Sequence, residues 1–309
     1  MYCRKIIVSL ELKKIDKLRK DRGGIKIPKQ IIFLIKLLEK VNSYVCMRFV
    51  SYIWTKPLRY KIPDREIPIT NSSNFSMVKI NEINKIVKCY RWIGKGPKIL
   101  VVHGWSARAS NMFYIIQELI YQGYDVYSFD APAHGDSPSK TTSIPEFIAC
   151  IKQLSNSVNS MYAIIGHSGG GFAAIYYTAM YDRNLEKLVI ISPFNSVYEL
   201  FQNFFKLIKI GNKVGHLLID FFNKKTGIKI DQNLTAHKLI KLINSNVLLI
   251  HDENDSEIPI SDSRKIKKNI KRGEVFFTKE LGHRRILRAK SVKNKIINFL
   301  VSHKESQSV

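Results

Sequence analysis

Ser168 lies at the centre of residues 166–170, whose sequence GHSGG has the spacing Gly-x-Ser-x-Gly. The apolar run at 161–165 precedes this motif, and small residues that can open a helix follow it. Between a strand and a helix, such a serine occupies a sharp, strained turn that exposes its hydroxyl at the end of a sheet. Glycines on both sides leave room for the neighbouring backbone. The pattern therefore indicates nucleophilic chemistry at Ser168.

Short apolar runs separated by helical lengths predict the elements that position this serine. The predicted strands cover residues 98–102, 125–129, 161–165, 188–191, 247–250 and 274–277, after a predicted hairpin over 78–84 and 85–93. Ser143 followed by Glu146 predicts a capping box, and Gly123 predicts the end of a helix. Strands that alternate with helices favour a parallel sheet covered on both faces, with ligands at the carboxyl ends of the strands.

The interval between Pro193 and Asn246 departs from this alternation. It has no strand signal but contains two or three apolar helical stretches that are rich in phenylalanine. A plain crossover between neighbouring strands needs only one helix. We therefore predict a helical lid at residues 194–245, with simple coverage of the sheet as the alternative.

The first 58 residues form a predicted N-terminal region, with a basic segment followed by an amphipathic helix over residues 28–54. Charges at Lys36, Glu39, Lys40 and Arg48 interrupt the apolar run, so it falls short of the roughly 20 residues that a membrane span needs. We expect this helix to dock on the domain that follows it in the chain or to lie on an anionic membrane surface, without spanning the bilayer.

The amino-acid composition limits which binding partners and which cellular compartment we expect. The chain has 309 residues, and 50 Lys+Arg against 25 Asp+Glu give a net charge of +25, which either serves a function or reflects codon bias. Nucleic acid is not an expected partner, because the basic residues form no aromatic-interleaved module of a known type. The four cysteines lie far apart, which favours a reducing, cytoplasmic location. We expect no metal and no cofactor, because no histidine pair has ligand spacing.

Two further turns follow predicted strands, VVHGW at residues 101–105 and FDAPAHGDS at residues 129–137. With GHSGG behind a third strand, the chain resembles the α/β-hydrolase family over about residues 75–303. The resemblance implies a mostly parallel eight-stranded sheet with helices on both faces and a helical lid, in a domain at residues 59–303. Residues 304–309 are expected to form a disordered tail. The family's catalytic residues follow the order Ser, then Asp or Glu, then His.

The resemblance assigns the base and the acid by their positions. The base follows the last strand, which favours His283 over His303 because His303 lies in the charged tail. The acid follows the preceding strand, where Asp255 matches best and Asp252 and Glu253 remain alternatives.

The same resemblance places the oxyanion hole at the backbone N–H groups of Trp105 and Gly169. His103 and His167 are expected to brace the nucleophile turn. Phe201, Phe204 and Arg284 are candidate substrate contacts, with a structural salt bridge as the alternative for Arg284.

These residues predict a serine hydrolase that cleaves an ester, thioester or amide through an acyl-enzyme, in the manner of a carboxylesterase or lipase. The expected substrate is a small molecule or a lipid-like acyl compound. Acyl transfer to an alcohol or amine is one alternative. A catalytically inactive, membrane-associated interaction protein on the same fold is another.

Overall fold

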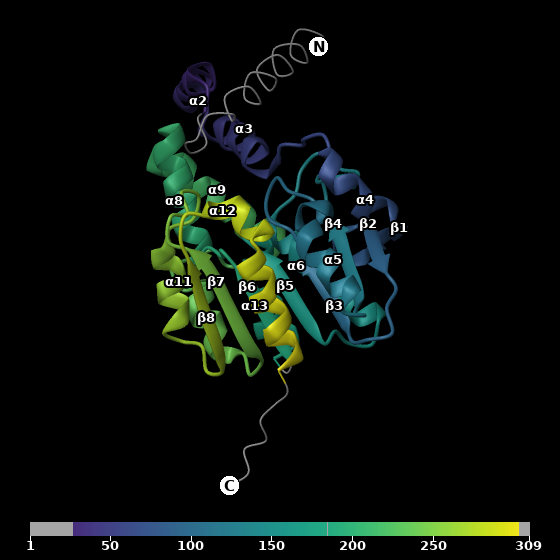
Figure 1. Ribbon diagram of the computed structural model, residues 1–309. Coiled ribbons are helices and arrows are strands. Elements are labelled where there is room, and N and C mark those ends of the chain that lie inside the picture. The colour runs from purple at the N-terminus through teal and green to yellow at the C-terminus, as the bar shows by residue number, and fades with distance from the viewer. Residues whose placement is uncertain (1–26, 184, 303–309) are drawn as a thin grey trace. The chain divides into compact units, whose positions relative to one another are not determined.

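The computed structural model describes residues 27–183 and 185–302, which form two compact units (Figure 1). The helical unit contains the described part of Met1–Leu58 together with Ser196–Leu234, and the sheet unit contains the described parts of Arg59–Asn195 and Thr235–Val309. Residues 1–26, which include the predicted basic stretch at 13–22, lie outside the described residues, as do His303 and the predicted tail at 304–309.

The sheet unit is built on an eight-stranded sheet in the order β1-β2-β4-β3-β5-β6-β7-β8. β1 pairs with β2 and β2 with β4 in antiparallel fashion, and every later pair is parallel. This confirms the predicted mostly parallel sheet. The strands are β1 (Asn74–Ile80), β2 (Lys85–Trp92), β3 (Lys98–Val102), β4 (Asp125–Asp130), β5 (Ala163–His167), β6 (Lys187–Ile191), β7 (Asn246–Asp252) and β8 (Gly273–Thr278).

The central strands are buried on both faces, because helices pack against each side of the sheet. On one face, Val101 and Ile165 share a core with α5 and α13 (Figure 1). On the other face α7 packs closely, since a Cβ added at Gly171 would lie 3.3 Å from Cγ2 of Ile190. The α-helices of this unit are α4 (Ile67–Asn71), α5 (Phe113–Tyr121), α6 (Ile144–Ser157), α7 (Gly169–Tyr181), α10 (Ala236–Leu239), α11 (Ile260–Lys267), α12 (Gly282–Arg285) and α13 (Lys290–Val301). Short 3-10 helices are η1 (Asp64–Glu66), η2 (Asn81–Ile83), η3 (Ala109–Met112), η4 (Ile240–Leu242) and η5 (Ile286–Arg288).

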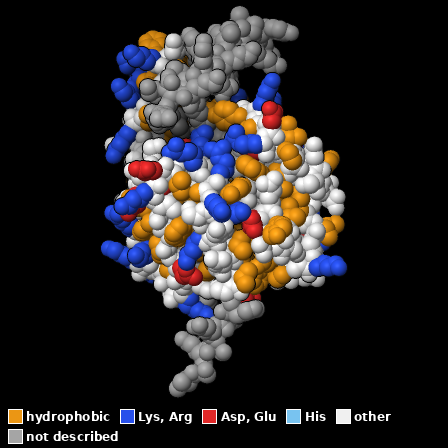
Figure 2. Space-filling view, in the orientation of Figure 1, with side chains coloured by type: hydrophobic (Ala, Val, Ile, Leu, Met, Phe, Trp, Pro, Cys, Tyr) orange, Lys and Arg blue, Asp and Glu red, His pale blue; other side chains and the backbone are white. Residues whose placement is uncertain are grey.

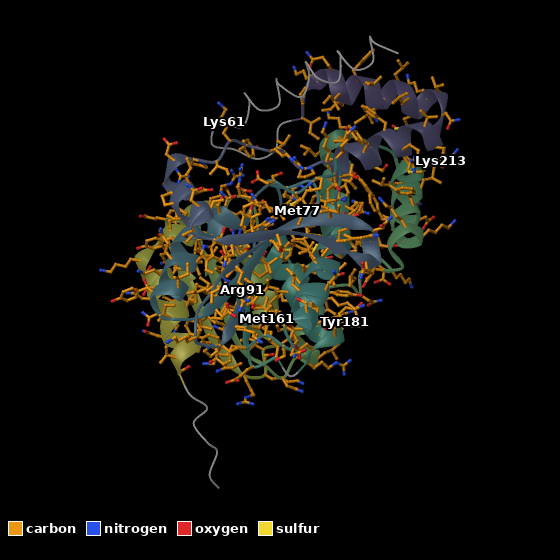
Figure 3. The ribbon with its side chains drawn as sticks, turned by 90° about the vertical axis from the view of Figure 1, so that its right-hand side faces the viewer. Lys61, Met77, Arg91, Met161, Tyr181 and Lys213 are labelled. Atoms are coloured by element: carbon orange, nitrogen blue, oxygen red, sulfur yellow. The ribbon has the colours of Figure 1, made fainter. Side chains whose placement is uncertain are left out.

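Charged side chains fix the antiparallel edge of the sheet. Arg91 on β2, labelled in Figure 3, donates from Nε and Nη2 to the carboxylate of Asp125 at the start of β4, at 3.0 and 2.8 Å. A two-pronged contact of this kind is geometrically specific as well as charge-assisted. It therefore sets the alignment of β2 on β4.

Of the two helix ends predicted from local sequence signals, one agrees with the structure and one does not. Gly123 follows α5 with φ +82° and donates its N–H to the carbonyl of Ile120 at 2.9 Å, so the predicted helix stop is confirmed. The predicted capping box is wrong, because Ser143 precedes α6 without a side-chain cap. The carboxylate of Glu146 instead accepts two 2.8 Å bonds from Nζ of Lys85, a charged partner that replaces the local amide.

The helical unit shows that residues 28–54 form two helices, so the prediction of one long helix is wrong. α2 (Lys29–Val41) and α3 (Ser43–Thr55) are separated by Asn42, whose backbone is extended. The side-chain oxygen of Asn42 accepts from the N–H groups of Tyr44 and Val45, which makes it the N-cap of α3. A residue with this competing local bond ends one helix and begins another.

The N-terminal helices share their core with the helices of the insertion, α8 (Val197–Ile208) and α9 (Asn212–Thr226). Trp54 of α3 packs on Phe201 and Phe204 of α8, with ring centroids 4.6 and 4.7 Å apart. α2 and α3 thus pack on α8 and α9, which lie within the predicted domain at residues 59–303 but belong to the helical unit. The segment 235–245, which the lid prediction included, belongs to the sheet unit.

Candidate active site

Ser168 occupies the turn between β5 and α7. Its backbone angles, φ 52° and ψ −120°, lie in a region that side chains other than glycine rarely adopt. Such a conformation costs on the order of 1–3 kcal/mol and persists only where the surroundings enforce it. Here the N–H of Ser168 donates to the carbonyl of Ile191 on β6 at 2.8 Å, and the carbonyl of Ser168 accepts from Phe172 at 3.1 Å. The turn therefore holds Ser168 in a strained position between a strand and a helix.

The glycines of the motif are required by close backbone contacts. A Cβ at Gly166 would lie 2.6 Å from the carbonyl oxygen of Gly170, and a Cβ at Gly170 would lie 2.3 Å from the carbonyl oxygen of His103. Both distances are far shorter than a van der Waals contact, and both partners are backbone atoms. The first turn of α7 thus packs directly against the ends of β5 and β3.

Asp255 and His283 come together although 28 positions separate them in the sequence. Asp255 lies in the loop after β7 and His283 in the short helix α12 after β8, and Nδ1–H of His283 donates to Oδ2 of Asp255 at 2.7 Å. The carboxylate is buried, and its other oxygen accepts from the N–H groups of Glu257 and Ile258 at 2.8 and 2.9 Å. This bond leaves Nε2 of His283 as the proton acceptor.

Burial alone would raise the pKa of Asp255, but hydrogen bonds outweigh it. The imidazoles of His251 and His283 and the amide of Ile258 all stabilise the charged form, and together they hold the pKa of Asp255 well below its usual value. The carboxylate is therefore ionised throughout the neutral pH range. No sequence pattern predicted a role for His251.

The carboxylate of Asp252 belongs to a different hydrogen-bond network. Its carboxylate accepts four hydrogen bonds, from the N–H groups of Asn254, Leu281 and Gly282 and from the hydroxyl of Thr278. Asp252 therefore links the loop after β7 to the segment that carries α12. Glu253, the other alternative, is an outward ion-pair partner of Lys279 at 3.5 Å. Among the three acids, Asp255 is the one that the structure joins to His283.

His283 lies beside the nucleophile turn. Its backbone carbonyl accepts from Nε2–H of His167, the residue before Ser168, at 3.0 Å, and the two rings are 4.7 Å apart. Burial, followed by the proximity of His283, keeps the pKa of His167 well below its usual value. A neutral His167 thus connects the serine turn to the backbone of the candidate base.

The backbone N–H of Trp105 lies near the start of α7. A Cβ at Gly169 would be 3.7 Å from the nitrogen of Trp105, so these two residues of the expected oxyanion hole are neighbours. Gly169 is the first residue of α7, and N–H groups in the first turn of a helix have no acceptor within that helix. Such groups favour negative charge at the helix N-terminus.

Two buried histidines hold the turn around Trp105 from both sides. Nδ1–H of His103 donates to the carbonyl of Gly104 at 2.7 Å, and Nε2 of His134 accepts from the N–H of Ser106 at 2.9 Å. Burial lowers the pKa of both histidines, so both stay neutral. His103 also accepts from the N–H of Ala131, so it braces its own turn and the loop after β4, whereas we expected it to brace the nucleophile turn.

The candidate substrate contacts lie in different surroundings. Arg284, whose side chain is 60% exposed, donates from Nε to Glu257 at 2.8 Å, which is the salt bridge considered as its alternative role. Phe201 is buried in the core of the helical unit, and Phe204 is partly buried against that core. Phe201 therefore packs inside its own unit.

Comparisons with known proteins agree with this architecture. The sequence model of the α/β-hydrolase fold family matches residues 97–224. The chain is 24% identical to a monoacylglycerol lipase of Xenopus laevis over 147 residues, which are 45% of this chain and 43% of the relative. It is 28% identical to a proline iminopeptidase of Saccharolobus solfataricus over 125 residues, 38% of this chain and 40% of the relative. The chain thus matches less than half the length of these curated relatives.

Solved structures show the same fold. An esterase of Pyrococcus furiosus superposes with a TM-score of 0.59 at 19% identity, covering 79% of this chain and 95% of the esterase. The chain therefore has the α/β-hydrolase fold, and the sequence model of that family matches its residues 97–224.

Proposed function

We propose that the protein is a serine hydrolase that cleaves acyl esters, with Ser168 as nucleophile, His283 as general base and Asp255 as the acid that orients it. One observation carries the proposal. His283 donates to the buried Asp255 at 2.7 Å while its backbone is bonded to His167, the residue before the strained Ser168. Nucleophile, base and orienting acid in neighbouring positions are the arrangement that activates a serine hydroxyl.

The reaction follows from what each group can donate or accept. Nε2 of His283 takes the proton of the Ser168 hydroxyl as its oxygen attacks the carbonyl carbon of the ester. The negative charge that develops on the carbonyl oxygen is stabilised by the N–H groups of Trp105 and Gly169, each worth roughly 10²–10³ in rate. His283 then gives the proton to the leaving alcohol, and an acyl-Ser168 ester remains. Water repeats the sequence, releasing the carboxylic acid and the free serine.

The names of the relatives support an ester as the bond that is cleaved. A monoacylglycerol lipase and an esterase are among them, and both names refer to ester substrates. We therefore propose a lipid-like or small acyl ester. The proline iminopeptidase keeps amide cleavage as an alternative. An acyltransferase would release the acyl group to an added alcohol or amine faster than to water, which product analysis distinguishes.

Covalent labelling tests the nucleophile directly. The wild-type protein is expected to react with a fluorophosphonate probe and to hydrolyse nitrophenyl esters, whereas Ser168→Ala should lose the label and about 10⁴–10⁶ in kcat. Ser76→Ala, which alters an exposed serine on β1, is the matched control and should label normally. Labelling that persists in folded Ser168→Ala would overturn the proposal.

We also propose that the helical unit contacts an anionic membrane surface. α2 buries Ile31 and Ile35, yet it exposes Phe33, Leu37 and Val41, which are 71%, 49% and 75% accessible. A spacing of four residues places these three side chains on one face of the helix. An interfacial helix combines such an apolar face with basic residues along its edge.

The lysines of α2 lie beside this face. Lys29, Lys36 and Lys40 are exposed, and helical spacing puts them on one adjoining stripe. Figure 2 shows Lys and Arg side chains next to exposed hydrophobic ones on the visible part of this unit. Each basic residue near an anionic surface contributes about 1 kcal/mol. Within residues 27–183 and 185–302, no helix is long and apolar enough to cross a bilayer. A cytoplasmic location stays a prediction.

Vesicle co-sedimentation distinguishes binding through this face of α2 from nonspecific adsorption to lipid. The protein should sediment with vesicles of phosphatidylserine and phosphatidylcholine, and less at high salt. Phe33→Ser with Leu37→Ser should weaken binding, whereas Tyr121→Ser, at a residue 84% exposed on α5, should not. Equal binding to neutral vesicles, or equal loss in the Tyr121 variant, would contradict the proposal.

A further inference from the structure

A second histidine contacts the candidate catalytic acid. His251, the penultimate residue of β7, is completely buried, and its Nε2 lies 3.3 Å from Oδ2 of Asp255. This is the same oxygen that accepts Nδ1–H of His283 at 2.7 Å. Oδ2 of Asp255 therefore lies between two imidazoles, and His251 has no place in the three-residue mechanism above.

The surroundings of His251 determine which of its nitrogens carries a proton. Nε2 also lies 3.1 Å from the carbonyl oxygen of Ile258, and both of its neighbours are acceptors. Nε2 must therefore carry hydrogen. Nδ1 lies 2.6 Å from the hydroxyl of Ser263 on α11, and a hydroxyl can either donate or accept. The donor towards Asp255 is consequently present whatever the charge of His251.

Both oxygens of Asp255 are then held by separate donors. Oδ1 accepts from two backbone N–H groups in the loop that follows. Oδ2 accepts from His283 and also lies 3.3 Å from Nε2 of His251, whose N–H is shared between this oxygen and the carbonyl of Ile258. The backbone bonds fix one end of the carboxylate, but a single bond to His283 would leave its other end free to follow that ring. His251 approaches from the β7 strand, and Ser263 ties its ring to α11.

We propose that His251 is a positioning residue for the catalytic acid, which it holds against His283 through its Nε2–H. This inference rests on the proposed role of Asp255. His251 does not act on the substrate, so its loss should lower kcat and leave KM nearly unchanged. Misplacement of a catalytic group by about 1 Å can cost about 10²-fold in rate, and we expect a loss of about 10–100-fold.

A change in the pH profile separates this role from simple packing. Nε2–H of His251 shares the negative charge of Asp255, so removing it leaves more charge facing His283 and favours the protonated imidazole. The acid limb of the plot of kcat against pH should then shift to higher pH by about half to one unit. Five other titratable residues lie on the elements that surround His251 and Asp255, and the variants leave all five unaltered. They are His167 on β5, Asp252 on β7, Glu257 in the loop after β7, Asp262 on α11 and Arg284 on α12.

Two amide substitutions form a matched test. Glutamine at position 251 places an N–H donor at about the reach of Nε2, whereas asparagine reaches only as far as Nδ1. With a short nitrophenyl ester, His251→Asn should lose 10–100-fold in kcat and shift the acid limb, and His251→Gln should recover most of both. Thermal unfolding of each variant shows that the comparison is made on folded protein. Equal kcat and an equal acid limb in the two folded variants would overturn the proposal.

Two further variants keep the outcome interpretable. Ser263→Ala removes only the outer bond of His251, and it should lower kcat a few-fold with KM unchanged. If neither amide variant folds, wild-type kcat and pH dependence in Ser263→Ala overturn the proposal. Ser168→Ala is measured in parallel. An active Ser168→Ala would refute the proposed function itself, whereas an inactive one beside an unaffected His251→Asn refutes only the role of His251.

Discussion

Exchanging each of two neighbouring aspartates for asparagine should separate catalysis from stability. Asp255→Asn keeps an oxygen for the N–H groups of Glu257 and Ile258 but turns an amide nitrogen towards His283. His283 must then accept at Nδ1 and carry its proton on Nε2, which is the wrong tautomer for deprotonating Ser168. In a serine triad this exchange costs about 10⁴ in kcat. At about 1.4 kcal/mol per factor of ten, that loss corresponds to about 5.5 kcal/mol of transition-state stabilisation.

Asp252→Asn should act mainly on stability. Its two oxygens each accept two hydrogen bonds, Oδ1 from Asn254 and Gly282 and Oδ2 from Thr278 and Leu281. An amide nitrogen in place of Oδ1 leaves the part-buried N–H groups of Asn254 and Gly282 without this acceptor, whereas in place of Oδ2 it leaves only that of Leu281, because the Thr278 hydroxyl can accept from the amide. The second orientation is the less costly one, and at about 1–3 kcal/mol for an unsatisfied group the expected loss is about 1–3 kcal/mol of unfolding free energy.

The assay combines kcat for a nitrophenyl ester with urea unfolding of both variants. Activity is compared well below the unfolding midpoint of Asp252→Asn, so that each rate refers to folded protein. Asp255→Asn should be nearly inactive with a modest change in stability, and Asp252→Asn should be active but less stable. A folded Asp252→Asn that loses far more activity than Asp255→Asn would show that the acid is wrongly assigned.

Three more outcomes are expected from the same geometry. Gly170→Ala should lower the unfolding free energy by roughly 1–3 kcal/mol, because its Cβ would lie 2.3 Å from the carbonyl of His103; unchanged thermal unfolding would contradict the close contact. Burial keeps the pKa of His134 and of His167 well below the unfolded value of about 6.5, so only the unfolded chain binds protons there. Stability should be full above pH 6.5 and fall as the pH drops below it, and a flat urea-unfolding profile from pH 8 to 5 would refute this. Phe204→Ala should lower the unfolding free energy, because its ring packs on Trp54 within the helical unit with centroids 4.7 Å apart; unchanged thermal unfolding would argue against this contact.

The predicted strands agree with the structure because each is a local signal. The runs at 98–102 and 247–250 appear as β3 (Lys98–Val102) and within β7 (Asn246–Asp252), since a continuous apolar stretch that is buried on both faces needs no partner information to be recognised. The first strand is longer than predicted at its start. β1 begins at Asn74, where Phe75 and Met77 alternate with polar residues, but all four residues at 74–77 are exposed.

The choice of the catalytic acid is a point that the sequence pattern leaves ambiguous. Asp252 and Asp255 are three residues apart behind the same strand, and both are plausible from the sequence. Only the folded chain shows that the carboxylate of Asp252 accepts hydrogen bonds from the backbone just before His283, whereas the carboxylate of Asp255 accepts from the imidazole of His283. His251 gave no sequence signal, because its contact with Asp255 depends on the turn between them.

The sequence by itself determined the strand-turn-helix around Ser168, since glycine spacing, a buried strand and small helix-opening residues all act within a few positions. Tertiary structure decided which side chains meet that turn. His283 reaches Asp255 across 28 positions, and Trp54 packs on Phe201 across 147, so that the insertion and the N-terminal helices share one core. Such contacts depend on the path of the chain between the residues, and no local pattern of residue types encodes that path.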